Sequence, residues 1–131
     1  MFEFITAVYA GILALFALVL SAFAGSYRGK AGVSILYGEP VNRELAVRVR
    51  RHQNFLEYVP MIVILMALIE INGGSAGMLH GIGISLIVAR VAHAAGLKAD
   101  SMSHPGRLIG AGGTALITVV AAVYCIWLAI A

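Results

Sequence analysis

Residues 4–27, FITAVYAGILALFALVLSAFAGSY, carry no acidic or basic side chain and are bounded by Glu3 and Arg28. A helix needs about 20 mostly apolar residues to cross a bilayer, so this stretch predicts a transmembrane helix over about 3–26. A secretory signal is the alternative, because residues 22–24 (AFA) resemble a cleavage site. The apolar run is longer than a signal core and no basic residue precedes it, which favours a retained helix.

Three further segments repeat this pattern. Nineteen uncharged residues separate Glu70 from Arg90, and 24 follow Arg107. Residues 56–71 are apolar apart from two glutamates and reach spanning length together with the polar run before them. We therefore predict an all-α integral membrane protein, a single domain over 1–131 folded as a four-helix up-down bundle. The predicted helices are about 3–26, 43–71, 77–97 and 106–130.

The composition supports this class and excludes a water-soluble domain. Hydrophobic residues make up 61% of the chain and charged residues 11%, whereas a soluble domain carries roughly 25% charged residues. So few charged side chains cannot cover the surface of a soluble globule.

The basic residues are concentrated on one side of the predicted bundle. Eight of the nine lie between the first two helices, between the last two, or at the adjoining helix starts: Arg28, Lys30, Arg43, Arg48, Arg50, Arg51, Lys98 and Arg107. The positive-inside rule places the first and third loops in the cytoplasm and both termini outside, as in a bacterial inner membrane. Because these cations adjoin the membrane, they predict attraction to membrane lipids and no nucleic-acid partner.

Polar residues recur within the predicted second and third helices. Arg50, Asn54 and Glu57 are spaced by four and three residues, which places them on one helix face. Arg90 and His93 share a face of the third helix at similar depth. We predict that Glu57 pairs with Arg90, with Asn54 and His93 close by. Two interpretations stay open: a structural ion pair that docks two helices, or a polar pocket for an anionic ligand, which the surplus of arginines favours.

Other chemical signals are weaker. The four histidines show no metal-ligand spacing, so no metal site is predicted. Cys125 lies in an apolar segment, where packing explains it better than nucleophilic catalysis. Two glycine pairs, Gly77 with Gly81 and Gly106 with Gly110, have the spacing that suits close contact between helices, within the protomer or between copies.

The segment 48–60, RVRRHQNFLEYVP, resembles the second-helix signature of the MAPEG family, the membrane-associated proteins in eicosanoid and glutathione metabolism. The residues that carry the resemblance are Arg50, Asn54, Glu57, Tyr58 and Pro60. The run RVAH at 90–93 resembles the third-helix segment of the prostaglandin-E-forming member. Length, four predicted spans and a basic first loop agree, so the resemblance covers essentially the whole chain.

The resemblance implies a homotrimer that binds glutathione between neighbouring protomers, near the cytoplasmic face. It implies these glutathione-binding residues: Arg50, His52, Asn54, Glu57, Tyr58, Arg90, His93 and, reaching across from the neighbour, Lys30. Arg107 matches the catalytic arginine with which family members stabilise the glutathione thiolate. A free thiol has a pKa of about 8.5, which a fixed cation nearby lowers. The thiolate would attack a hydrophobic electrophile or a lipid hydroperoxide.

One departure from the family pattern bears on the activity. Leu97 stands where several eicosanoid-forming members have a tyrosine that contacts glutathione. The resemblance therefore favours a general glutathione S-transferase or peroxidase of the microsomal, bacterial type, acting in detoxification. Two alternatives remain: a non-catalytic MAPEG-like protein that binds lipid or assists a partner, and a small transporter or channel subunit. The second is disfavoured because the polar residues cluster in one half of the bilayer.

Overall fold

The computed structural model describes residues 4–131, which form four long helices and no β-sheet. The helices are α1 (Ile5–Ala31), α2 (Arg43–Ile71), α3 (Ala76–Gly96) and α4 (Pro105–Ile130). All four are long and apolar enough to cross a membrane. The prediction of an all-α membrane protein with four spans is confirmed.

The helix bounds agree closely with the predicted ones except at the end of α1. α2 spans the predicted 43–71, whereas α3 and α4 each begin one residue early. α1 continues past residue 26 to Ala31, and its predicted start at residue 3 lies outside the described residues. Gly32, with a left-handed φ of 65°, ends the extension by donating to the Arg28 and Gly29 carbonyls. Arg28 and Lys30 favour a helical last turn because their charges complement the helix dipole.

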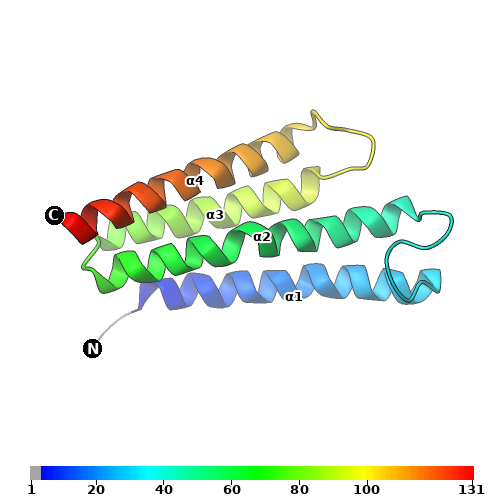
Figure 1. Ribbon diagram of the computed structural model, residues 1–131, viewed down its shortest axis with the longest axis horizontal. Helices are drawn as coiled ribbons and strands as arrows, with labels where there is room; N and C mark the ends of the chain where they lie inside the picture. Colours follow the sequence, from blue (N-terminus) through cyan, green and yellow to red (C-terminus); the bar gives the residue numbers. More distant parts are fainter. Residues whose placement is uncertain (1–3) are drawn as a thin grey trace.

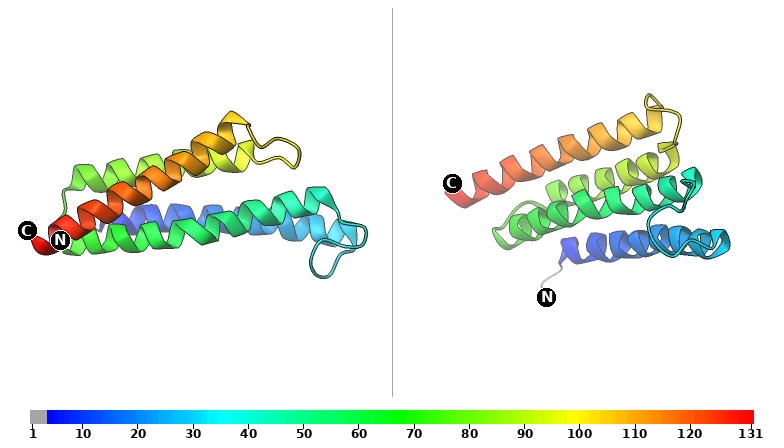
Figure 2. Two further views of the ribbon diagram at one scale, coloured as in Figure 1. Left: turned by 45° about the horizontal axis from the view of Figure 1, so that its top comes forward. Right: turned by 45° about the vertical axis from the view of Figure 1, so that its right-hand side comes forward.

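Successive helices run in opposite directions, so loop 1 (residues 32–42) and loop 3 (residues 97–104) lie at the same end (Figure 1). We call this end the polar end. α2 and α3 are antiparallel and in contact, as predicted. α1 packs on α2 and α3, and α4 packs on the same two helices. α1 and α4 lie on opposite sides (Figure 2) and do not contact each other within the described residues.

Polar side chains complete the backbone hydrogen bonding at the helix starts. Asn42 Oδ1 accepts from the Leu45 N–H at 3.0 Å, so α2 begins with a side-chain cap. The Glu70 carboxylate, near the end of α2, accepts from the backbone N–H groups of Ile5 and Thr6. Because this contact joins the start of α1 to the end of α2, it sets the axial register between the two antiparallel helices.

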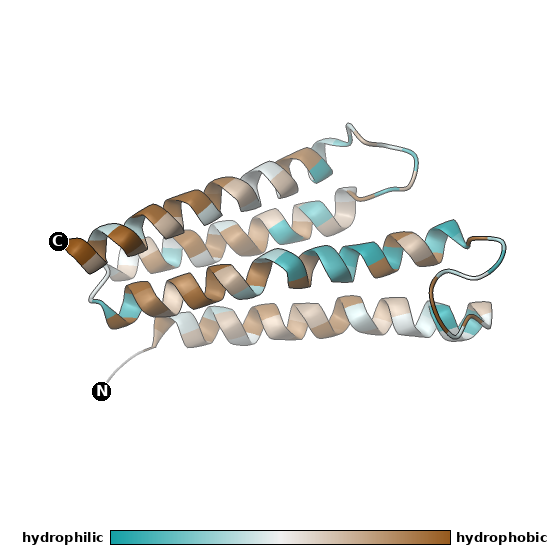
Figure 3. Ribbon diagram, viewed as in Figure 1, coloured by the Kyte–Doolittle hydropathy of each residue, from teal (hydrophilic) through white to brown (hydrophobic). Residues whose placement is uncertain are grey.

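Apolar side chains occupy both the core and the outside of the bundle. Leu13 and Leu86 are buried in the core, whereas Leu15, Val88 and Val119 are each more than half exposed. Helices that are apolar all round are typical of membrane spans. Figure 3 shows the hydrophilic residues gathered on the half of α2 toward the polar end, with hydrophobic residues toward the other end. The chain is an integral membrane protein.

Glycines let α3 and α4 approach closely at the polar end. A Cβ at Gly110 would collide with the backbone of His93, and one at Gly96 with the backbone of Gly106 and Arg107. The predicted close contact is confirmed at Gly106 and Gly110, whereas a Cβ at Gly77 or Gly81 would meet nothing within 4 Å in this chain. This contact holds the start of α4 against the part of α3 that carries Arg90 and His93.

Candidate functional site

A buried arginine joins three helices toward the polar end. Arg90 on α3 is only 1% exposed. Its Nη2 donates to Asn54 Oδ1 on α2 at 2.7 Å, and its Nη1 donates to Thr114 Oγ1 on α4 at 3.4 Å. The guanidinium also lies 5.5 Å from the centre of the Phe55 ring. No carboxylate pairs with Arg90 among residues 4–131. Its charge is therefore stabilised by neutral acceptors and an aromatic ring.

The predicted ion pair between Glu57 and Arg90 is wrong. Glu57 pairs with Arg50 on its own helix, with Nη1–Oε1 and Nη2–Oε2 distances of 2.6 and 3.1 Å. A spacing of seven residues places the two on one face, two turns apart, within reach of an arginine side chain. The two side chains are 48% and 46% exposed, so they lie on the outside of α2. Arg90 lies inside the bundle, where Asn54 rather than Glu57 faces it.

His93 lies beside Arg90 on the next turn of α3. It is 3% exposed, and its Nδ1 lies 3.4 Å from Arg90 Nη2, so the predicted neighbourhood of Arg90 is confirmed. The guanidiniums of Arg90, Arg107, Arg50 and Arg51 are all close enough to act on the imidazole electrostatically. Among these four arginines, Arg50 is paired with the carboxylate of Glu57. The region therefore carries surplus positive charge, which suits an anionic ligand.

Two cavities open beside these residues. One, of about 380 Å³, lies between the start of α2 and loop 3, and Arg43, Arg50, Leu97 and Lys98 are among its lining residues. This volume is within the range of small-molecule sites, about 300–1,000 Å³. The other, of about 110 Å³, is lined in part by Asn54, Tyr58, Arg90 and Thr114. Arg50 lines the first cavity and buried Arg90 lines the second, so a ligand that occupied both would contact both arginines.

The structure brings most of the predicted site residues to one region. Arg50, Asn54, Glu57 and Tyr58 share one side of α2, Arg90 and His93 lie on α3, and Arg107 lies in the first turn of α4. His52, two residues before Asn54, lies on the opposite side of α2 and is not brought to this region. Lys30 does not join them in the same way. It is exposed in the last turn of α1, and α1 makes no contact with α4 within the described residues. A role for Lys30 beside Arg107 therefore requires a second protomer.

Two residues that sequence reasoning did not assign to the site support it. The Thr114 hydroxyl accepts from Arg90 and donates to the Gly110 carbonyl at 2.6 Å. The sequence does hold a sign of this role: Thr114 lies seven residues after Arg107, a spacing that puts both on one face of α4. Arg51 Nη2 donates to the Leu97 carbonyl at 2.8 Å and so ties α2 to loop 3.

Comparisons with known proteins find similarity over most of the chain. The model of the MAPEG family matches residues 6–127. The chain is 34% identical over 89 residues to "Inner membrane protein YecN" of Escherichia coli strain K12, and equally to its counterpart in Escherichia coli O6:H1. These alignments span 68% of this chain and 66% of each relative, just under two thirds of the relative's length. No solved structure gives a significant match.

Proposed function

Because the chain belongs to the MAPEG family, we propose that it is an integral-membrane glutathione S-transferase or peroxidase. Its substrates would be hydrophobic electrophiles or lipid hydroperoxides that enter from the bilayer. Glutathione is the cosubstrate, and the mechanism needs no metal. The proposed location is a bacterial inner membrane, with loops 1 and 3 in the cytoplasm, as the positive-inside rule predicts.

The observation that carries this proposal is the ion pair between Arg50 and Glu57 on a membrane-spanning helix. Both side chains are nearly half exposed in the single chain, and charged groups that face hydrocarbon are costly. The pair therefore requires a polar covering. A neighbouring protomer with glutathione between the two chains would provide one, which supports the homotrimer with intersubunit sites. Lys30 could then approach the site from the adjacent chain.

Glutathione has the charges that this region would bind. Its two carboxylates could pair with Arg50 and Arg90, and its amino group could pair with Glu57. The amide of Asn54 and the Tyr58 hydroxyl would bond its peptide groups. His93 would contribute a further polar contact. Surplus arginine is useful here, because each carboxylate that leaves water needs a charged partner.

Arg107 is the proposed catalytic residue. Its fixed charge near the thiol would lower a pKa that is about 8.5 in free thiols, so that thiolate forms at neutral pH. In the transferase reaction the thiolate sulfur attacks an electrophilic carbon and forms a thioether, either by displacing a leaving group as its anion or by adding to an activated double bond that then takes up a proton. In the peroxidase reaction the thiolate attacks the terminal oxygen of the hydroperoxide, which breaks the O–O bond, releases the alcohol once it is protonated, and leaves glutathione sulfenic acid. A second glutathione thiol attacks that sulfur and forms the disulfide with release of water.

The test is a titration of glutathione into the purified protein in detergent, followed by ultraviolet absorbance of the thiolate. We expect a saturable signal at neutral pH in the wild type. Arg107→Ala should bind glutathione but lose the thiolate signal, and Arg50→Ala should weaken binding. Arg28→Ala is the matched control, because this arginine also lies at the polar end but bonds the Leu36 carbonyl of loop 1. Its titration should match the wild type.

Each contrary result has a defined meaning. No glutathione binding would reject the proposed pocket, and unchanged affinity in Arg50→Ala would remove this residue from it. Glutathione binding without thiolate in the wild type would reject catalysis. That outcome would favour the non-catalytic alternative, a MAPEG-like protein that binds lipid or assists a partner.

A further inference from the structure

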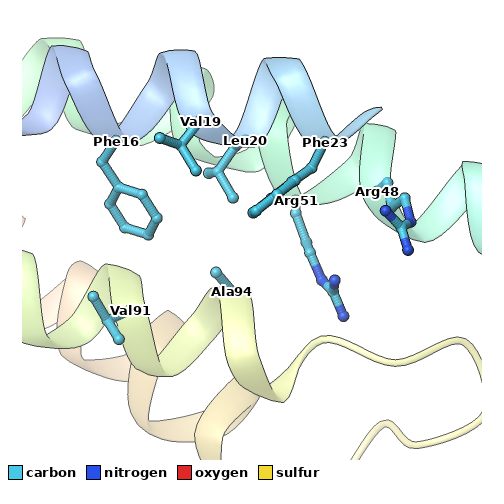
Figure 4. Close-up of a pocket in the computed structure, with 8 residues that line it drawn as sticks. All are labelled: Phe16, Val19, Leu20, Phe23, Arg48, Arg51, Val91 and Ala94. Carbon is cyan, nitrogen blue, oxygen red and sulfur yellow. The ribbon is translucent and has the colours of Figure 1, made fainter. Parts of the chain in front are cut away.

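A third cavity, of about 460 Å³, lies between α1 and α3 on the side of the bundle away from α4. Its lining includes Phe16, Phe23, Val91 and Ala94, with Arg48 and Arg51 of α2 as its cationic members. We call it the α1–α3 groove. Figure 4 shows the apolar side chains of α1 facing α3 across the groove, with both guanidiniums toward the polar end. None of the proposed glutathione-binding residues lines it.

The charged end of the groove has more donors than acceptors. Arg51 Nη2 bonds the Leu97 carbonyl, but its Nε is buried without a partner among the described residues. Arg48 is paired with Glu44 at 2.7 Å and lies over the Tyr27 ring at 4.5 Å. Arg51 has no carboxylate partner within residues 4–131. A guanidinium beside apolar space is stabilised by an anion, so this end of the groove favours an anionic group.

The rest of the groove favours a hydrocarbon chain. Phe16 and Phe23 are seven residues apart, which corresponds to about 10 Å along α1. The apolar wall thus runs from the two arginines toward the middle of the membrane. A ligand that fills the groove needs an oxyanion at one end and an acyl chain at the other. Two guanidiniums match the oxygen atoms of a phosphate better than a single cation does.

We propose that the α1–α3 groove binds one anionic glycerophospholipid of the surrounding bilayer. Its phosphate lies on Arg51 and Arg48, and one acyl chain lies along Phe16, Phe23 and Val91. A bilayer lipid is the occupant that mass action favours, because it surrounds these helices in large excess over any soluble anion. The site goes beyond the proposed thiol chemistry and does not depend on it.

The experiment measures lipid retained by the purified protein. The full chain in mild detergent is incubated with phosphatidylglycerol or with phosphatidylcholine of the same acyl chains, washed, and analysed by native mass spectrometry. We expect one phosphatidylglycerol per chain and little phosphatidylcholine. Arg51→Gln keeps a donor for the Leu97 carbonyl but removes the charge. It should lower the affinity at least about tenfold, the factor that corresponds to roughly 1.4 kcal/mol.

Two further variants distinguish the groove from general surface charge. Ala94→Phe fills the groove and leaves both arginines, so it should also abolish retention. Arg43→Gln removes an exposed α2 cation that pairs with Asp100 outside the groove, and it should retain lipid as the wild type does. Circular dichroism of each variant shows whether the helices have formed.

Three results with the phospholipids and variants would overturn the proposal, and a fourth comes from competition with a fatty acid. The first is equal retention of the two phospholipids, and the second is full retention in folded Arg51→Gln. The third is a fall in oligomeric mass with unchanged lipid in Ala94→Phe, which would show that a second copy of the chain covers the groove. A competing arm with a free fatty acid completes the test, because displacement of phosphatidylglycerol at equal concentration would assign the site to carboxylates instead.

Discussion

Gly110→Ala should destabilise the protein, because the added methyl group has no space. Gly110 is buried, and a Cβ there would collide with the backbone and Cβ of His93 on α3. Backbone cannot move aside as a flexible side chain can, so α3 and α4 must separate locally. Gly112→Ala is the matched control, two residues along the same helix, where a Cβ meets nothing within 4 Å.

The pair of variants isolates the packing contribution. Replacing glycine by alanine inside a helix gains about 1 kcal/mol of helix propensity, and this gain is common to both variants. Overpacking costs about 1–3 kcal/mol and applies at Gly110 alone. The free energy of unfolding should therefore be about 1–3 kcal/mol lower for Gly110→Ala than for Gly112→Ala.

The assay is unfolding in one detergent, followed by circular dichroism, with glutathione titration as a second readout. Gly112→Ala should be at least as stable as the wild type. Gly110→Ala should melt at a lower temperature than Gly112→Ala and bind glutathione more weakly, since the displaced His93 lies beside Arg90. Equal melting temperatures for the two variants would refute the close approach of α3 and α4 on which this reasoning depends.

Three other substitutions test individual contacts. Asn54→Ala removes the Nη2 acceptor of buried Arg90 and leaves a charged donor unsatisfied, so the free energy of unfolding should fall by about 3 kcal/mol in a denaturant titration; a loss under about 1 kcal/mol would contradict this. Glu57→Gln leaves both acceptors of Arg90 in place, so in the same titration it should destabilise the protein less than Asn54→Ala does. A loss like that of Asn54→Ala would restore the rejected pairing with Arg90. Glu70→Gln weakens the acceptor for the first N–H groups of α1, so hydrogen exchange at Ile5 and Thr6 should accelerate; unchanged exchange would show that this contact does not hold the helix start.

The sequence determined the membrane class and nearly all of the helix bounds. The absence of charge over residues 4–27 and the equivalent later stretches reflects a requirement of the bilayer itself, so it is visible without tertiary information. Only the end of α1 was misjudged, because polar residues 28–31 stay helical beyond the apolar span.

The grouping of site residues was also largely readable from the sequence. Helical spacing placed Arg50, Asn54 and Glu57 on one side of α2, and Arg90 next to His93 on α3. The motif gave the family, which the comparisons show independently. Spacing alone could not say which member of the α2 face points into the bundle, because residues three apart differ by about 60° around the helix axis.

The tertiary structure decided which side chains pair with the arginines of the site. The rotation of α2 against α3 turns Asn54 inward to Arg90 and leaves Glu57 outside with Arg50. The same packing creates the α1–α3 groove and leaves Arg51 Nε without a partner among the described residues. These features depend on how three helices meet in space. Periodicity along one chain fixes the faces of each helix, whereas the angle at which those faces meet follows from side-chain packing between helices.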